Sequence, residues 1–311
     1  MTFTPTALRT AVGSGLLSFP VTHFDQEGRF DEAPYRRHVA WMAGYAPAAL
    51  FAAGGTGEFF SLTLDEYPAI IRAAAESVPA TMPLIAGVGY GTAMAVQFAR
   101  AAEKAGAHGV LALPQYLVGA EQEGLYRHVK AICDSVGIGV IVYNRDNCVL
   151  TADTVARLAD ACPNLIGFKD GVGNVELLMA VRHKLGDRLT YVGGMPTAEV
   201  HALAGQAMGI TTYSSAVFNF IPEFAASFFK ALRGHDQPAL DRMIQDFFLP
   251  YLDIRNRRPG YAVSIIKAGL RLTGRPAGPV RTPLIDLTPK DEADLASLLD
   301  RCFGSRAIAA E

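Results

Sequence analysis

Short apolar runs recur along the chain at nearly regular intervals. Each run is continuous rather than alternating with polar residues, which is typical of strands that are covered on both faces. The segments between the runs are longer and more polar. The predicted strands cover residues 15–21, 48–54, 83–89, 109–114, 138–144, 165–171, 189–195 and 209–215.

Between these runs, apolar residues return at steps of three and four, which indicates amphipathic helices. Thr63 followed by Glu66 forms a capping-box pattern at one helix start, and Thr151 and Asn174 stand where N-caps belong. The predicted helices between strands include residues 61–78, 92–107, 121–136, 151–162 and 174–185.

Strands that alternate with helices in this way predict a (β/α)8 TIM barrel over residues 1–234, which would carry the active site. An open doubly wound sheet is the structural alternative, but no glycine cluster follows the first strand. Residues 235–311 predict a C-terminal helical extension packed on the barrel. Its helical segments are 237–254, 260–274 and 289–303.

Charge and composition exclude several classes of protein. The net charge is -2 and no basic block is present, so we expect no nucleic-acid partner. No apolar run approaches the ~18 residues of a membrane span, and the N-terminus lacks the pattern of a secretory signal. Four scattered cysteines without a CxxC pair predict reduced thiols in a cytoplasmic protein.

The histidines give no indication of a metal site. The sequence contains seven, and none shows the HExxH spacing or another ligand spacing. We therefore expect neither a metal nor another cofactor. His23, His183 and His201 are expected at the surface or at the rim of the barrel.

Lys169 is the candidate nucleophile, because active sites of such barrels lie at the C-terminal ends of the strands. It is the only lysine within the eight apolar runs. A free lysine is only about 0.1% neutral at pH 7, but a desolvated site lowers the pKa and exposes the amine. Lys169 then forms a Schiff base with a substrate ketone. The structural alternative is an ion pair with Asp170 or Glu58.

Other strand ends carry candidate partners for this chemistry. Tyr143 ends the neighbouring strand and could relay protons, or simply belong to the core. In "GGTGE", the backbone N–H groups around Gly55 and the Thr56 hydroxyl suit a carboxylate, although a tight turn is the alternative. Arg145 and Asn147 could reach a second carboxylate, or lie in a solvated loop.

These motifs, in this order, resemble the dihydrodipicolinate synthase / N-acetylneuraminate lyase family over nearly the whole chain. "GGTGEF" is similar to the family's G-T-T-G-E, with Gly55 in place of the first threonine. Tyr143 matches the tyrosine of Y-N, and Lys169 matches the Schiff-base lysine of G-x-K-[DE]. "EQEGLYRHVKAI" and "GRPAGPVRTPL" resemble the helix after strand four and the C-terminal signature.

The resemblance implies roles for these residues. Lys169 forms the imine, Tyr143 moves protons, and Gly55 with Thr56 binds the carboxylate next to the ketone. Tyr116 aligns with a tyrosine that family members contribute to a neighbouring subunit. A homo-oligomer, either a dimer or a tetramer built as a dimer of dimers, is therefore expected.

Two motifs indicate a branch of the family. "VYNRDN" and "TTYSSAVFNF" look most like the members that dehydrate and decarboxylate 5-dehydro-4-deoxyglucarate, a 2-keto-3-deoxy sugar diacid. The proline that typically follows Tyr-Asn in the synthases is absent, which argues against synthase-like condensation. An aldolase releasing pyruvate and a non-catalytic sugar-acid binding protein remain alternatives. The groups expected at the distal hydroxyl and carboxylate are Ser214, Ser215, Asn147 and Arg145.

Overall fold

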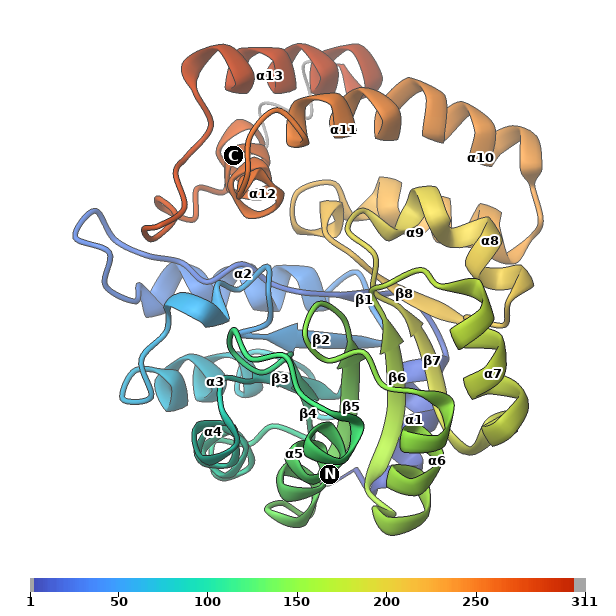
Figure 1. The fold of residues 1–311 in the computed structure, drawn as a ribbon. Coiled ribbons are helices and arrows are strands. Elements are labelled where there is room, and N and C mark those ends of the chain that lie inside the picture. The colour runs from blue at the N-terminus through green and yellow to red at the C-terminus, as the bar shows by residue number, and fades with distance from the viewer. Residues whose placement is uncertain (1–2, 305–311) are drawn as a thin grey trace.

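The computed structural model describes residues 3–304 and contains a closed barrel of eight parallel strands in the order β1 to β8 (Figure 1). The barrel closes where β8 pairs with β1, with Leu17 opposite Ser214. All eight predicted strands are present, and the open-sheet alternative is excluded. The strands are β1 (Leu17–Ser18), β2 (Ala49–Ala52), β3 (Leu84–Val88), β4 (Gly109–Ala112), β5 (Gly139–Asn144), β6 (Leu165–Asp170), β7 (Thr190–Gly193) and β8 (Thr212–Ser215).

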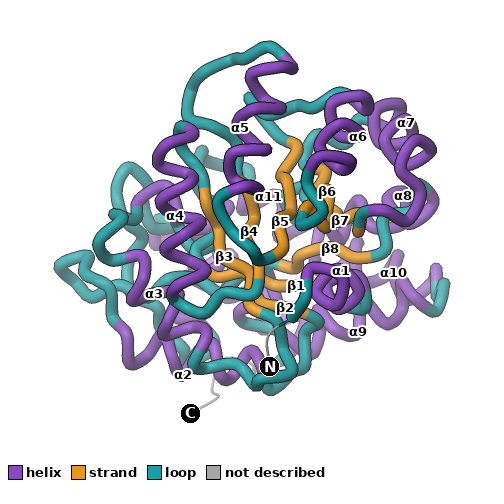
Figure 2. Tube along the Cα trace, turned by 90° about the horizontal axis from the view of Figure 1, so that it is seen from below, coloured by secondary structure: helices purple, strands orange, loops and turns teal. Residues whose placement is uncertain are grey.

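Helices surround this ring of strands, as the view from below shows (Figure 2). The α-helices of the barrel wall are α2 (Glu32–Ala43), α3 (Tyr67–Ala75), α4 (Thr92–Lys104), α5 (Gln122–Asp134), α6 (Ala152–Ala161), α7 (Val175–Leu185), α8 (Ala202–Ala207) and α9 (Pro222–Arg233). Short 3-10 turns are η1 (Phe59–Ser61), η2 (Gly186–Arg188), η3 (Ala198–His201) and η4 (Val217–Asn219).

Two predicted helix starts are confirmed by their cap contacts. The Thr151 hydroxyl accepts a hydrogen bond from the N–H of Thr154 at 3.3 Å, and α6 begins at the next residue after Thr151. The Asn174 side chain accepts from the N–H of Leu177 at 3.0 Å and caps α7 in the same way. Both side chains satisfy amide groups that the first helical turn leaves free.

The helix predicted from residue 61 begins later, at Tyr67. The capping contacts between Thr63 and Glu66 are present, at 2.8 and 3.3 Å, but they close a turn that precedes α3. Pro68 is the reason, because a proline is tolerated only in the first turn of a helix. A start at residue 61 would place this ring in the helix interior, where it clashes with the preceding turn.

A helix that the sequence pattern did not reveal, α1 (Pro5–Gly13), closes the N-terminal end of the barrel. Leu8 and Val12 of α1 pack into the apolar interior formed by the strands. Gly109 and Gly139 make room for Leu8, since a Cβ at either position would lie 2.7 or 2.8 Å from its Cδ2 atom. The opposite end, where the strands finish, is left for the functional site.

The C-terminal segment forms a helical layer above the barrel, coloured orange to red in Figure 1. Residues 305–311 of the predicted extension lie outside the described residues, and the boundary between residues 234 and 235 remains a proposal. The elements of this layer are α10 (Gln237–Met243), the π-helical turn η5 (Ile244–Phe248), α11 (Leu249–Arg255), α12 (Tyr261–Leu272) and α13 (Pro289–Phe303).

The π-helical turn interrupts what the sequence predicted as one helix over residues 237–254. Pro250 lies two residues after this turn and has no N–H, so the carbonyl of Asp246, four residues earlier, loses its helical partner. The Sγ atom of Cys302 on α13 donates to this carbonyl at 3.4 Å. The turn is therefore held by a contact from α13.

Candidate functional site

A cavity of about 490 Å³ opens at the C-terminal ends of the strands, between the barrel and helices α11 and α12. Most of the residues that the sequence singled out meet here, although they come from five different strand ends. Those lining the cavity are Gly55, Thr56, Tyr116, Tyr143, Arg145, Asn147, Lys169 and Ser214.

Lys169 lies in β6 near its C-terminal end, and its side chain is only 3% exposed. The Nζ atom donates a hydrogen bond to the Ser214 hydroxyl at 3.0 Å. It also lies 4.2 Å from the ring centre of Phe19 and 4.8 Å from that of Tyr143. The amine is thus enclosed by two aromatic rings and one hydroxyl.

The predicted structural alternative, an ion pair of Lys169 with Asp170 or Glu58, is excluded. The Asp170 carboxylate accepts from the N–H groups of the following loop, at 3.1 Å from Val172. Glu58 pairs instead with Lys267 at 2.7 Å. Burial, assisted by the positive charge of Arg145, lowers the pKa of Lys169 to about 7. The lowered pKa makes the neutral amine far more abundant at pH 7 than in a free lysine.

Tyr143 lies directly opposite Lys169 in the register between β5 and β6. Its hydroxyl donates to the carbonyl of Gly194 at 2.5 Å and accepts from the Nη1 atom of Arg145 at 3.1 Å. Burial raises the pKa of Tyr143 above its usual value. The phenol therefore stays protonated at neutral pH and can act as a proton donor beside the amine.

Gly194, directly after β7, permits this arrangement. A Cβ atom at this position would lie 2.7 Å from the Cε2 atom of Tyr143 and 2.8 Å from the Cγ atom of Lys169. Any side chain would therefore displace one or both functional groups. The sequence analysis missed this residue, and the Gly-Gly pair at the end of the seventh apolar run is the signal that could have revealed it.

Gly55 and Thr56 of the "GGTGE" turn after β2 line the cavity. Ala53 and Glu58 enclose the turn, and both are non-glycine residues with positive φ, +48° and +57°. Within the described chain, the N–H groups of Gly55, Thr56 and Gly57 donate to no other group. Strained turns with free N–H groups form anion-binding nests.

A buried ion pair anchors this turn to the C-terminal extension. Glu58 and Lys267 of α12 are both 0% exposed, with 2.7 Å between the carboxylate and the ammonium group. The same ammonium donates to the carbonyl of Pro279 at 2.7 Å. The second carboxylate oxygen of Glu58 accepts from the backbone N–H of Arg281 at 2.8 Å.

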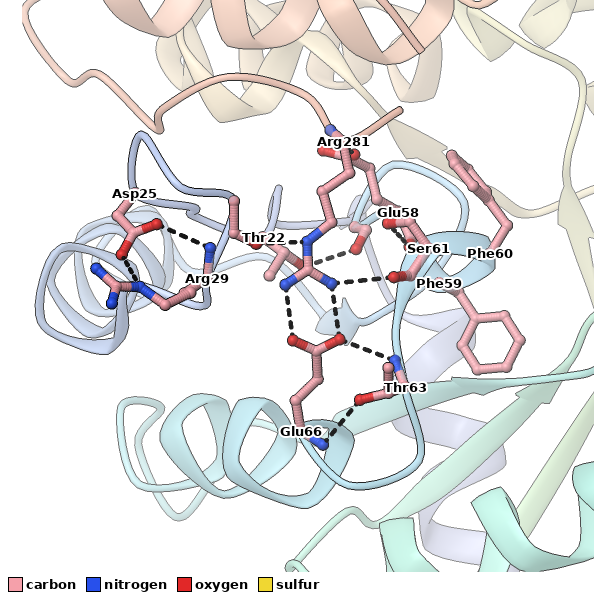
Figure 3. Close-up of polar contacts among 12 residues, drawn as sticks. Thr22, Asp25, Arg29, Glu58, Phe59, Phe60, Ser61, Thr63, Glu66 and Arg281 are labelled. Carbon is pink, nitrogen blue, oxygen red and sulfur yellow. Dashed lines mark hydrogen bonds and ion pairs between the residues drawn. The ribbon is translucent and has the colours of Figure 1, made fainter. Parts of the chain in front are cut away.

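The Arg281 side chain extends this anchor towards α3. Its guanidinium donates to both carboxylate oxygens of Glu66 at 2.7 Å, and to the carbonyl of Ser61 at 3.0 Å (Figure 3). We call Glu58, Glu66, Lys267 and Arg281 the clamp. It connects the extension to the loop that carries Gly55 and Thr56, and the sequence analysis did not reveal it.

Ser215 is a correction, because it does not reach the cavity. Successive side chains of a strand point to opposite faces, so Ser214 faces Lys169 while Ser215 points away. Its buried hydroxyl donates to the carboxylate of Glu199 at 2.6 Å. Burial also raises the pKa of Glu199 to about 7.

His23 is a second correction. It was expected at the surface or rim but is buried, with its ring centre 5.1 Å from that of His38, whereas His183 and His201 are exposed. Among residues 3–304, no group of His, Cys, Asp or Glu side chains is arranged to hold a metal ion. No helix in the same range is long and apolar enough to cross a membrane.

The loops after β4 and β5 form one wall of the cavity together. The Gln115 side chain donates to the carbonyl of Asn147 at 2.7 Å and to that of Val118 at 2.9 Å. Tyr116 lies beside this link, largely exposed, with its ring centre 6.3 Å from that of Tyr90. The same chain therefore places Tyr116 on its own cavity.

The opposite wall contains residues that the sequence analysis missed. Thr197 follows β7, while Tyr251 and Arg255 come from α11. The Nη1 atom of Arg255 donates to the Thr197 hydroxyl at 2.6 Å. Tyr251 and Arg255 lie on the helix that follows the turn at η5, which no local pattern predicted.

Known proteins resemble this chain over nearly its whole length. Residues 13–302 match the model of the dihydrodipicolinate synthetase family. A probable 5-dehydro-4-deoxyglucarate dehydratase from Rhizobium rhizogenes is 62% identical over 95% of this chain and 98% of its own length. One from Chelativorans sp. is 59% identical, again over 95% of this chain and 98% of its own length.

Solved structures share the fold. A dihydrodipicolinate synthase from Bacillus clausii superposes with a TM-score of 0.86 at 26% identity, covering 95% of this chain and 99% of that one. A prophage protein of the dihydrodipicolinic acid synthase family from E. coli K12, in complex with pyruvate, has a TM-score of 0.82 at 26% identity, with 92% and 97% coverage. The barrel, the lysine of β6 and these matches lead to one conclusion: the chain belongs to the dihydrodipicolinate synthetase family.

Proposed function

We propose that this protein is a Schiff-base lyase that converts 5-dehydro-4-deoxyglucarate to 2,5-dioxopentanoate, with loss of water and CO2. The observation that carries the proposal is the Lys169 amine, which is buried beside Tyr143, lacks a carboxylate partner and has a pKa lowered to about 7. Such an amine is a nucleophile at neutral pH. The names of the relatives at about 60% identity support the choice of substrate.

The reaction begins with attack of the Lys169 amine on the C2 ketone, counted from the keto-acid end of the substrate. The carbinolamine loses water and gives an imine. The imine acidifies the C3–H bond, and loss of this proton gives an enamine that expels the C4 hydroxyl. Tyr143 supplies the proton that the departing hydroxyl needs, because its phenol is protonated.

Decarboxylation uses the same electron sink. Dehydration leaves a C3–C4 double bond conjugated to the imine. When the C6 carboxylate leaves as CO2, the electrons of the C5–C6 bond move through this system to the imine nitrogen. Protonation of the carbon chain and hydrolysis of the imine release 2,5-dioxopentanoate and restore Lys169. This route needs no metal or organic cofactor.

Binding roles follow from the walls of the cavity. We assign the C1 carboxylate to the N–H groups and hydroxyl of the Gly55–Thr56 turn, and the C4 hydroxyl region to Ser214. Arg145 donates a hydrogen bond to the phenol of Tyr143, so we assign it to the proton relay. Tyr116 and Asn147 complete the wall on the side of β4 and β5.

We further propose that the protein is a cytoplasmic homo-oligomer. Its four cysteines are unpaired, which suits a reducing compartment. The exposed aromatic and aliphatic side chains of the β4–α5 loop, at the edge of the cavity, support the association of subunits.

The test is an assay with 5-dehydro-4-deoxyglucarate that measures CO2 and 2,5-dioxopentanoate together. We expect equal amounts of both, and a borohydride-reduced adduct on the peptide that contains Lys169. Lys169→Ala should abolish turnover and adduct while the protein retains its circular dichroism spectrum. Pyruvate without CO2 would instead establish the aldolase, and binding without either product would establish a sugar-acid binding protein.

A further inference from the structure

We infer that Arg255 binds the distal carboxylate of the substrate and makes the cavity selective for 2-keto diacids over 2-keto monoacids. The inference deepens the function proposed above and rests on it for the identity of the natural substrate. It concerns a residue of the C-terminal extension, outside the strands and loops that hold the reacting atoms.

The position of Arg255 follows from the turn at η5. α11 continues directly from the π-helical residues of η5, whose wider winding shifts the positions of the residues that follow around the helix. Tyr251 and Arg255 are four residues apart on this helix, so they share one face. Both line the cavity. The π-helical turn thus presents a cation from the extension to the site in the barrel, and such turns are frequent at functional sites.

The charges around the cavity distinguish Arg255 from the other cations that line it. Arg145 has a carboxylate partner in Asp146 at 3.2 Å and also donates to the phenol of Tyr143. Lys169 forms the imine with the ketone, so it does not bind the distal carboxylate. Arg255 forms no ion pair with any carboxylate in the described chain, although its side chain is half-buried. Burial lowers its pKa, so a bound anion would offset the cost of desolvation.

The remaining N–H groups of Arg255 suit a carboxylate. Its Nη1 atom donates to Thr197 at 2.6 Å, and its Nε and Nη2 atoms donate to Asn256 at 3.1 and 2.9 Å. A guanidinium group has five N–H groups in total, so one remains on each terminal nitrogen. These two N–H groups can donate to both oxygens of a carboxylate. Thr197, at φ +52°, is held in a strained conformation that supports this orientation.

In this arrangement a six-carbon diacid extends from the turn after β2, past Lys169, to Arg255. Its C1 carboxylate lies at the turn after β2, and its C2 atom is bonded to Lys169 on β6. The rest of the chain then follows the wall formed by Ser214 in β8 and Thr197 after β7, and ends at Arg255. Arg255 stabilises the carboxylate before it leaves, whereas the imine accepts the electrons. Loss of Arg255 should therefore raise KM more than it lowers kcat.

The test uses imine trapping, which does not require dehydration or decarboxylation. Wild type, Arg255→Gln and Arg255→Lys are treated with borohydride and either 2-oxoadipate, a six-carbon diacid, or 2-oxohexanoate, the monoacid of the same length. For wild type, we expect half-maximal trapping at a lower concentration of the diacid than of the monoacid. In Arg255→Gln the half-saturating concentration of the diacid should rise by about 10- to 100-fold, with that of the monoacid unchanged. Arg255→Lys should recover part of the preference.

Two controls separate recognition from structure. Arg258→Gln removes an exposed arginine that does not line the cavity. It should leave the half-saturating concentrations of the diacid and of the monoacid unchanged. Arg145→Gln should weaken trapping of both acids alike. If Arg255→Gln keeps the wild-type preference, or if only Arg145→Gln loses it, the inference is wrong. Failure of the proposed function is a separate result, namely wild type that releases no CO2 from 5-dehydro-4-deoxyglucarate.

Discussion

At the scale of single residues, the pH dependence of Lys169 is the most direct consequence of its burial. Its pKa is lowered to about 7, so the neutral amine predominates above this pH and is lost below it. We expect kcat/KM to fall about tenfold per pH unit on the acid side of about pH 7. A pH–rate profile over pH 5 to 9 measures this.

The matched variant for this profile is Arg145→Leu. The positive charge of Arg145 contributes to the lowered pKa of Lys169, so its removal should move the acid limb to higher pH. The variant is also expected to be slower, because Arg145 donates to the phenol of Tyr143. An acid limb that lies near the pKa of an ordinary lysine in wild type would contradict the buried, neutral amine.

The close packing around Gly194 leads to a second prediction for a single residue. Gly194→Ala places a methyl group 2.7 Å from the Tyr143 ring and from the Asp170 carbonyl oxygen, and 2.8 Å from the Lys169 side chain, so the reacting groups or the strand that carries them must shift. We expect kcat to fall by roughly 100-fold or more, because small misplacement of reacting groups is costly. Gly91→Ala is the control for turnover, since Gly91 does not line the cavity and a Cβ there meets nothing within 4 Å. Similar kcat values for the two variants would refute this role of Gly194.

At the scale of elements, the sequence revealed repeated patterns better than contacts between distant segments. The strands were predictable because both of their faces are buried, and Thr151 and Asn174 were predictable because caps are local. The start of α3 and the turn at η5 depend on where Pro68 and Pro250 fall in a helix. The clamp was not predictable, because its partners are separated by more than 200 residues, as in the contact of Glu58 with Arg281.

The clamp leads to a prediction about stability and binding. Lys267→Met leaves the Glu58 carboxylate buried without its partner, which costs roughly 3–5 kcal/mol of unfolding free energy. The double variant Lys267→Met/Glu58→Gln should lose less unfolding free energy than Lys267→Met, because no unpaired charge remains buried. Since the clamp holds the turn with Gly55 and Thr56, KM should rise in both variants. Urea denaturation and steady-state kinetics measure the two effects.

The control for this prediction is Lys290→Met, which breaks an exposed ion pair with Asp294 on α13. Exposed pairs contribute little, so its unfolding midpoint should stay close to wild type. The role of the clamp would be contradicted if Lys267→Met were equally harmless. A large loss of stability with unchanged KM would restrict the clamp to a structural role.

At the scale of the whole molecule, a single chain leaves part of its active-site wall uncovered. Tyr116 lines the cavity, and the next two residues, Leu117 and Val118, are 74% and 63% exposed. Leu117 also has a positive φ of +57°, which is unusual for a bulky residue. Exposed apolar residues in such a group are typical of protein interfaces, so we expect this loop to be covered by a second copy of the chain.

Light scattering after size-exclusion chromatography tests this expectation. Wild type should have a mass of at least twice the 33.2 kDa of one chain. Leu117→Asp/Val118→Asp should lower the mass and reduce turnover, because Tyr116 precedes this pair in the wall of the cavity. Ile285→Asp, at an exposed apolar residue of the C-terminal segment, should do neither. A monomeric wild type, or a double variant with wild-type mass and turnover, would show that the loop does not join subunits and that one chain forms the complete site.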